Sequence, residues 1–241
     1  MEQNKVRTYF LYALGEILLV MIGILLALQV NNWNQDRLER LEESNSLKSL
    51  TKELSDNLEI FDRDYARHLN RKAAIMEFIS DDILENELTY VDSISFVANY
   101  SWTYDPSLGI YNSIISSGKI SIFQNEELRS SISSLGDLIN DYQEEEQLIR
   151  DFSNDHLSIA IISEFIIIPE IAVGLRERTE LEVRAHRKNY EDFLNKQEIR
   201  NMYSLLLFYI YDLENEGRAF RQEFVQLISD METEIERLEN K

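Results

Sequence analysis

Cysteine is absent from this chain of 241 residues, and proline, glycine and histidine are scarce, with two, seven and three residues. The absence of cysteine excludes disulfide bonds, thiolate zinc sites and cysteine nucleophiles, and it is compatible with either side of a bacterial inner membrane. Proline and glycine interrupt helices, so their scarcity in a chain rich in Leu, Ile and Glu predicts long helices with few turns. We therefore expect an all-α fold.

Positive charge is also in short supply, because 24 Lys and Arg face 44 Asp and Glu and give a formal net charge of −20. The first 30 residues contribute nothing to this excess, since Glu2 and Glu16 offset Lys5 and Arg7. The rest of the chain is strongly acidic and repels phosphate backbones, so we expect no nucleic-acid partner.

Motifs that carry catalysis or bind cofactors are missing. His68, His156 and His186 are isolated, and none belongs to a Glu-x-x-His or His-Glu-x-x-His pattern. There is no glycine-rich phosphate loop and no Gly-x-Ser-x-Gly elbow. The acidic runs at 81–82 and 144–146 lack the glycine turn of a calcium loop and read as solvated faces. We expect no enzyme, no catalytic residue, no cofactor and no metal.

The longest feature is an apolar run over residues 9–30. About 20 apolar residues are enough for one helix to cross a bilayer. The run is too long for a signal peptide and no small-x-small cleavage site follows it, so we expect a retained anchor. Interfacial residues Asn31, Asn32, Trp33 and Asn34 come next, with Trp33 where an aromatic belt is expected.

Charges on the two sides of this run are nearly balanced: Lys5 and Arg7 precede it, and Arg37 and Arg40 follow. The short tail over 1–8 favours a cytoplasmic N-terminus, because a small segment is easily left inside. We predict a tail (1–8), a transmembrane helix (9–30) and an acidic periplasmic domain (31–241) on a bacterial inner membrane.

One face of the predicted transmembrane helix contains a costly acid beside small residues. At about 100° per residue, Gly23 and Ala27 lie on the same face as Glu16. A carboxylate at that depth costs about 3 kcal/mol on insertion scales, whereas a small-xxx-small pair lets two helices approach closely. Glu16, Gly23 and Ala27 therefore predict a contact with another helix. Two alternatives stay open, an acid wetted by water or paired with Arg7, and a proton-carrying acid.

The remaining chain predicts three long amphipathic helices and some short ones. The first covers residues 38–83, with apolar side chains that include Leu58, Tyr65, Leu69 and Met76, and it continues from the membrane helix without a proline. The second covers 125–168, capped by Asn125, and the third covers 196–240. We expect an elongated antiparallel helical bundle with a coiled-coil-like seam.

An Ile-rich corner and a basic patch separate the second and third helices. If the second helix returns antiparallel to the first, its end lies beside the bilayer. We therefore predict that the corner and the basic patch contact the lipid surface. The alternative for the corner is a buried cap on the bundle, and the alternative for the basic patch is ion pairing with neighbouring glutamates. The residues of this predicted contact are Phe165, Ile166, Ile167, Ile168, Ile171, Arg176 and Arg178.

Two segments show a resemblance to a known family. The first runs through Gly15-Glu16-Ile17, Ile22-Gly23-Ile24, Ala27-Leu28-Gln29 and Asn31-Asn32-Trp33-Asn34, and the second through Tyr111-Asn112 and Ser116-Ser117-Gly118-Lys119-Ile120. They resemble an uncharacterised family of small bacterial membrane proteins, a domain of unknown function, that opens with this signature. The resemblance implies a single-span protein and supplies no mechanism.

These features favour a membrane scaffold or accessory subunit. It would self-associate, or bind another membrane protein, through the Glu16 face and the outer bundle. Two alternatives stay open, a periplasmic sensor module and an ion-path subunit of a motor or transporter that uses Glu16. Replacing Glu16 with Gln separates a packed contact, which tolerates an amide, from a proton path, which does not.

Overall fold

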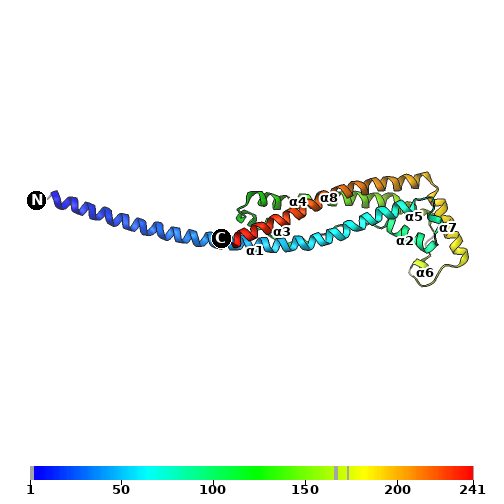
Figure 1. Ribbon diagram of the computed structural model, residues 1–241, viewed down its shortest axis with the longest axis horizontal. Helices are drawn as coiled ribbons and strands as arrows, with labels where there is room; N and C mark the ends of the chain where they lie inside the picture. Colours follow the sequence, from blue (N-terminus) through cyan, green and yellow to red (C-terminus); the bar gives the residue numbers. More distant parts are fainter. Residues whose placement is uncertain (1–2, 166–167, 173, 241) are drawn as a thin grey trace.

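The computed structural model describes residues 3–165, 168–172 and 174–240, with side chains from Leu14 onward other than that of Pro169. The described residues form helices and connecting segments without a strand, which confirms the predicted all-α class. A long apolar helix leads into an elongated helical bundle (Figure 1).

Helix α1 (Gln3–Phe78) is a single helix of 76 residues. No proline interrupts it, and its two glycines lie in the apolar part, so the apolar segment and the first bundle helix form one continuous rod as predicted. At about 1.5 Å per residue it is about 115 Å long. Its first half extends away from the rest of the chain (Figure 1).

The bundle consists of the second half of α1 with α4 (Glu126–Phe152) and α8 (Gln197–Glu239). Helix α8 runs antiparallel to α1 and brings the C-terminus back to the point where α1 enters the bundle (Figure 1). Its bounds agree with the predicted third helix. Asn125 caps α4, since its side chain accepts a hydrogen bond from the backbone N–H of Leu128.

The direction predicted for the second long helix was wrong. Gln124 N donates to Glu43 Oε1 beside the start of α4, whereas His68 Nε2 lies 2.9 Å from Glu146 Oε1 further along both helices. Residue numbers thus rise together, and α4 runs parallel to α1. The physical reason is the connection. After η1 (Ile83–Glu85) and α2 (Leu88–Asn99), an extended segment returns along α1 to α3 (Gly109–Ser116) and η2 (Lys119–Ile122).

The end of the bundle that lies away from the apolar segment is built from short helices. Helix α4 continues through a π-helical turn, η3 (Ser153–Ser158), into α5 (Ile159–Glu164). The short helix α6 (Pro169–Ala172) and α7 (Glu180–Leu194) follow, and a capping box at Thr179 and Glu182 starts α7. Figure 1 shows α2, α5, α6 and α7 together at this distal end.

The core follows the predicted apolar pattern in the first part of the bundle segment of α1, where Leu50, Leu54 and Phe61 are buried, and departs from it beyond Phe61. Leu69 and Met76 are exposed, although the pattern places them in the seam. The buried face steps by three and four residues through polar as well as apolar positions, which are Leu50, Leu54, Asn57, Phe61, Asp64, His68, Arg71, Ile75 and Phe78. At the centre, the rings of Phe61, Tyr104, Tyr142 and Phe220 contact one another with centroids 4.7 to 6.2 Å apart.

Candidate functional site

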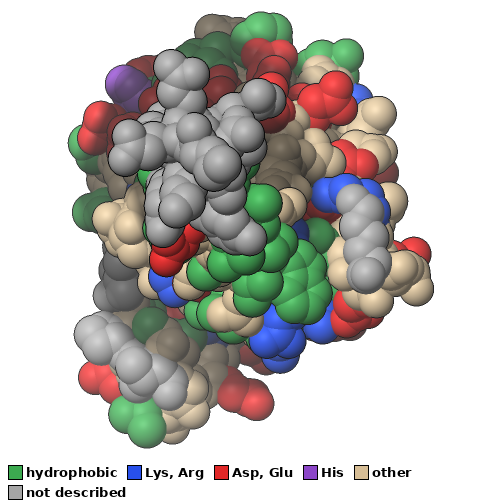
Figure 2. Space-filling view, turned by 90° about the vertical axis from the view of Figure 1, so that its left-hand side faces the viewer, with side chains coloured by type: hydrophobic (Ala, Val, Ile, Leu, Met, Phe, Trp, Pro, Cys, Tyr) green, Lys and Arg blue, Asp and Glu red, His purple; other side chains and the backbone are tan. Residues whose placement is uncertain are grey.

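The apolar half of α1 packs against nothing in the described chain. Every residue from 14 to 38 is exposed, and the large side chains from Leu14 to Val30 expose between 44% and 74% of their surface. Hydrophobic side chains form a visible green area in the end-on view (Figure 2). By length and composition this helix can cross a membrane.

The predicted face of this segment is fully open. A Cβ atom built on Gly23 meets no atom within 4 Å, and Glu16 forms no hydrogen bond or ion pair with any described side chain. The side chain of Arg7 is outside the described residues, so its predicted pairing with Glu16 stays a prediction. Asn31, Asn32, Trp33 and Asn34 are exposed on the same helix, and Trp33 exposes 68% of its surface.

The open face continues beyond the apolar segment. At about 100° per residue, Asn34, Leu38, Leu41 and Asn45 lie within about 40° of the direction of Glu16. Leu38 and Leu41 are exposed by 51% and 58%, which is high for leucines so close to a helical bundle. We call these four residues the proximal seam. Sequence reasoning expected the seam over residues 38–58 to extend a self-association, and this expectation stays a prediction.

A groove of about 410 Å³ borders the proximal seam. Leu38, Leu41 and Asn45 of α1 form one wall, and Ile110 and Ile114 of α3 belong to the other side. Its position could not be read from the sequence, because it depends on the extended segment that carries α3 back to this end of the bundle.

An ion pair and a backbone hydrogen bond fasten η2 and the residues after it to α1 near this groove. The carboxylate of Glu43 accepts hydrogen bonds from the Arg40 guanidinium and from Gln124 N, and Lys119 Nζ lies 2.8 Å from Glu42 Oε1. Gly118 has φ of 72°, a left-handed conformation that ends α3 and starts η2 at little steric cost.

A second cluster is a polar layer buried between α1 and α4. His68 Nε2 lies 2.9 Å from Glu146 Oε1, and the other Glu146 oxygen accepts a hydrogen bond from Tyr104 N at 2.7 Å. His68 Nδ1 and the hydroxyls of Tyr104 and Tyr142 are buried without a partner. Because His68 and Glu146 are nearly inaccessible, this layer fixes the relative height of the two helices and offers no surface to a large ligand.

Arg71 lies at the distal end of this layer and is fully buried. It donates to Ala98 O, Ser101 Oγ and Ser153 Oγ at 2.9 to 3.0 Å, and no described carboxylate pairs with it. Burial lowers the pKa of Arg71 to about 10. The guanidinium therefore joins α1, α2 and η3 through hydrogen bonds to uncharged acceptors. No sequence motif indicates these contacts.

A third feature is a pocket of about 640 Å³ at the distal end, between α2, α7 and the Ile-rich corner. Its polar side centres on Asp92, which accepts hydrogen bonds from Arg178 Nη1 at 2.6 Å and Tyr190 OH at 2.9 Å and lies 2.9 Å from His186 Nε2. Burial raises the pKa of Asp92, but the bonds from His186, Tyr190 and Arg178 outweigh it, so its pKa lies below the ordinary value.

The predicted lipid-contact residues lie at this distal end. The ring of Phe165 packs on His186, Tyr190 and Phe193. Since α4 runs away from the apolar segment, the corner cannot lie beside the membrane that this segment would enter, and the predicted lipid contact of Phe165, Ile168, Ile171, Arg176 and Arg178 is withdrawn. Ile166 and Ile167 lie outside the described residues.

The basic patch is engaged in ion pairs at this corner. Arg178 binds Asp92, and Arg176 donates to both Glu182 oxygens at 2.8 and 2.9 Å. These contacts match the alternative of pairing with neighbouring acids.

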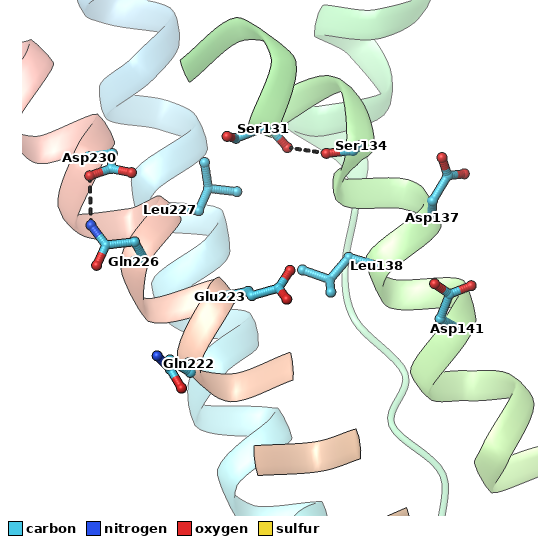
Figure 3. Close-up of a pocket in the computed structure, with 10 residues that line it drawn as sticks. All are labelled: Ser131, Ser134, Asp137, Leu138, Asp141, Gln222, Glu223, Gln226, Leu227 and Asp230. Atoms are coloured by element: carbon cyan, nitrogen blue, oxygen red, sulfur yellow. Dashed lines mark hydrogen bonds between the residues drawn. The ribbon is translucent and has the colours of Figure 1, made fainter. Parts of the chain in front are cut away.

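A groove of about 480 Å³ between α4 and α8 is lined by several acidic side chains (Figure 3). Glu223 of α8 and Leu138 of α4 face one another across it, and Asp137, Asp141 and Asp230 line it (Figure 3). Among the described residues no group of three His, Asp or Glu is placed to hold a metal ion, here or at the acidic runs.

Comparison with known proteins places the chain in a family. A family model described as "Family of unknown function" matches residues 16–149, more than half of the chain. The match covers the Glu16 face, the proximal seam, the groove beside α3 and most of α4. No curated protein and no solved structure matches the chain. The chain thus belongs to DUF6090, a family of unknown function.

Proposed function

We propose that this protein is a single-pass membrane scaffold that associates with a second copy of itself, in parallel, through one face of α1. The observation that carries the proposal is the open face that runs without interruption from Glu16 to Leu41, in a helix with no break. The proposed role is structural rather than enzymatic. In this proposal the tail lies in the cytoplasm and the bundle in the periplasm, in keeping with the basic residues Lys5 and Arg7 before the apolar segment.

A bilayer covers most of the apolar half of α1. Each large apolar side chain removed from water contributes about 1.5–3 kcal/mol, so the exposed Leu, Ile and Val side chains strongly favour lipid. Lipid does not satisfy Glu16, which has no described partner. A second helix does, because a carboxyl group can hydrogen-bond its counterpart across a two-fold axis while Gly23 and Ala27 allow close approach.

The proximal seam extends the same contact into water. Asn34, Leu38, Leu41 and Asn45 follow one another at steps of four, three and four residues, the spacing of core positions in a two-stranded coiled coil. Paired leucines would bury the side chains of Leu38 and Leu41 that the single chain leaves exposed. Paired asparagines at core positions favour parallel, in-register dimers.

Disulfide cross-linking tests the dimer directly, since the chain has no native cysteine. In native membranes under mild oxidation, we expect Leu41→Cys to give a covalent dimer. Asp36→Cys is the matched control. Asp36 is also exposed and lies near Leu41 along α1, but its side chain is on the opposite side of the helix. Equal cross-linking of the two variants, or none at Leu41→Cys, contradicts the proposed interface. Labelling of Asp36→Cys by an impermeant maleimide in intact cells tests the orientation.

Variants of Glu16 separate the proposal from the ion-path alternative. Glu16→Gln should keep the Leu41→Cys cross-link, because an amide still hydrogen-bonds across the interface. Glu16→Leu should weaken association about three- to thirtyfold, the range for a lost interhelical hydrogen bond in lipid. If Glu16→Gln keeps the dimer but abolishes the protein's effect in cells, titration of Glu16 is required and the ion-path role is favoured.

A further inference from the structure

We propose that the distal pocket binds a small amphiphile with an apolar body and one carboxylate group. This site is separate from the α1 interface and does not depend on it. The pocket has a volume of about 640 Å³. Pockets for small molecules usually measure about 300–1,000 Å³ and combine apolar walls with a few converging polar groups.

The apolar side of the pocket comes from two separate parts of the chain. Phe96 of α2 lines it while exposing 64% of its surface, and Phe165, Ile168 and Ile171 of the corner lie on another side. A large aromatic side chain that is so exposed at the rim of a pocket is stabilised when a ligand covers it. This side therefore fits a hydrocarbon or aromatic body.

The polar side contains two contacts that cannot be satisfied at the same time. His186 Nε2 lies 2.9 Å from Asp92 Oδ1, which only accepts while ionised, and 3.1 Å from Arg178 Nη2, which only donates. One ring nitrogen either donates or accepts. When it donates to Asp92, the N–H of Arg178 Nη2 that points at it lacks an acceptor.

A ligand carboxylate resolves this conflict. One of its oxygens accepts from Arg178 Nη2, and His186 is then free to donate to Asp92. A second donor is available, because Asn189 lines the pocket and its amide makes no hydrogen bond within the described chain. Guanidinium and carboxylate groups match in shape and charge. Asp92 accepts hydrogen bonds from Arg178 Nη1 and Tyr190 OH, which leaves Arg178 Nη2 for the ligand, and both oxygens of Glu182 are held by Arg176.

Binding can be measured on the full chain in phosphatidylcholine nanodiscs by ligand-detected NMR, with empty nanodiscs as the blank. The probe is 4-phenylbutyrate, and 4-phenylbutan-1-ol is its uncharged counterpart. We expect saturable binding of the carboxylate, about tenfold or more tighter than that of the alcohol, as for a charge-assisted hydrogen bond. Binding to the blank alone, or equal affinity for both compounds, overturns the proposal.

Three variants locate the site. Arg178→Gln should lower the affinity for 4-phenylbutyrate about tenfold or more and leave the alcohol nearly unchanged. Arg184→Gln removes the same charge from a side chain that is 81% exposed and does not line the pocket, so it should change neither. Ala185→Phe fills the pocket from an exposed helical position and should abolish binding of both compounds. Equal affinities in Arg178→Gln and Arg184→Gln, or normal binding in Ala185→Phe, refute the assignment.

Discussion

Gly217 of α8 lies directly against the ring of Tyr65 of α1, and its replacement by alanine tests the packing of the bundle. A Cβ atom built on Gly217 would lie 2.4 Å from Cε2 and 2.7 Å from Cδ2 of Tyr65, and 3.3 Å from Cε2 of Tyr142. Contacts below 3.0 Å are not tolerated by folded proteins, so one of the groups has to move. Gly217→Ala should therefore destabilise the bundle, although alanine favours helix formation.

The size of the effect follows from what holds Tyr65. Its hydroxyl donates to Glu214 O at 2.9 Å, and its ring stacks on Phe61 with centroids 5.4 Å apart. Moving the ring gives up the hydrogen bond, about 1 kcal/mol, and adds about 1–3 kcal/mol of overpacking. The higher helix propensity of alanine returns about 1 kcal/mol. We expect a net loss of about 1–3 kcal/mol in the free energy of unfolding.

The assay is denaturant unfolding of the full chain in nanodiscs, followed by circular dichroism. Gly109→Ala is the matched control, because the nearest atom to its Cβ is Glu53 Oε2 at an ordinary 3.7 Å, and it should change stability by less than about 0.5 kcal/mol. In a double-mutant cycle, Tyr65→Leu should remove most of the penalty of Gly217→Ala. A Gly217→Ala variant that is more stable than the parent chain would falsify the close approach of α8 to α1.

Two further predictions concern carboxylates. Glu146→Ala removes the acceptor of His68 and Tyr104 N from a buried polar layer and should lower the free energy of unfolding by about 3–5 kcal/mol in the same assay. The control is Glu144→Ala at an exposed neighbouring position, which should lower it by less than about 0.5 kcal/mol. Similar losses in both variants would contradict a buried pair. Hydrogen bonds from Arg176, together with the Thr179 backbone, lower the pKa of Glu182 from 4.5 to about 2. Because the folded pKa is the lower one, the contribution of Glu182 to stability is complete above pH 4.5 and is lost as the pH falls to about 2. Carboxyl NMR should show Glu182 titrating near pH 2 and returning toward 4.5 in Arg176→Gln, and an ordinary titration in the unmodified chain would contradict the contact.

Local signals in the sequence predicted the helices well. The missing prolines predicted the continuity of α1, the capping residue Asn125 marked the start of α4, and the glycine at 118 marked the turn after α3. Each of these depends on residues within a few positions of one another. The direction of α4 does not, because it depends on an extended return over residues 100–108 that carries no helical period and no hairpin signal.

The buried face of α1 shows a second limit. Asp64, His68 and Arg71 occupy core positions at regular three- and four-residue steps after Phe61, but a pattern search based on apolar residues passes over them. Asp64 is bound by Arg63 and Arg67 of α1 itself, whereas the burial of His68 and Arg71 depends on partners from α4, α2 and η3 that are distant in the sequence. The same holds for the distal pocket, whose polar groups come from residues 92 and 178–190. The predictions for Glu16, Gly23 and Ala27 concern a neighbour outside this chain and await the cross-linking test.

The unbroken course of α1 has a mechanical consequence. From Val30 to Phe78 the helix advances about 70 Å without a proline or a glycine to act as a hinge. A change of 10° in tilt where the helix leaves the lipid would swing the far tip sideways by about 12 Å. The rod is thus a stiff lever arm, and motion at either extremity is passed on to the other instead of being absorbed between them.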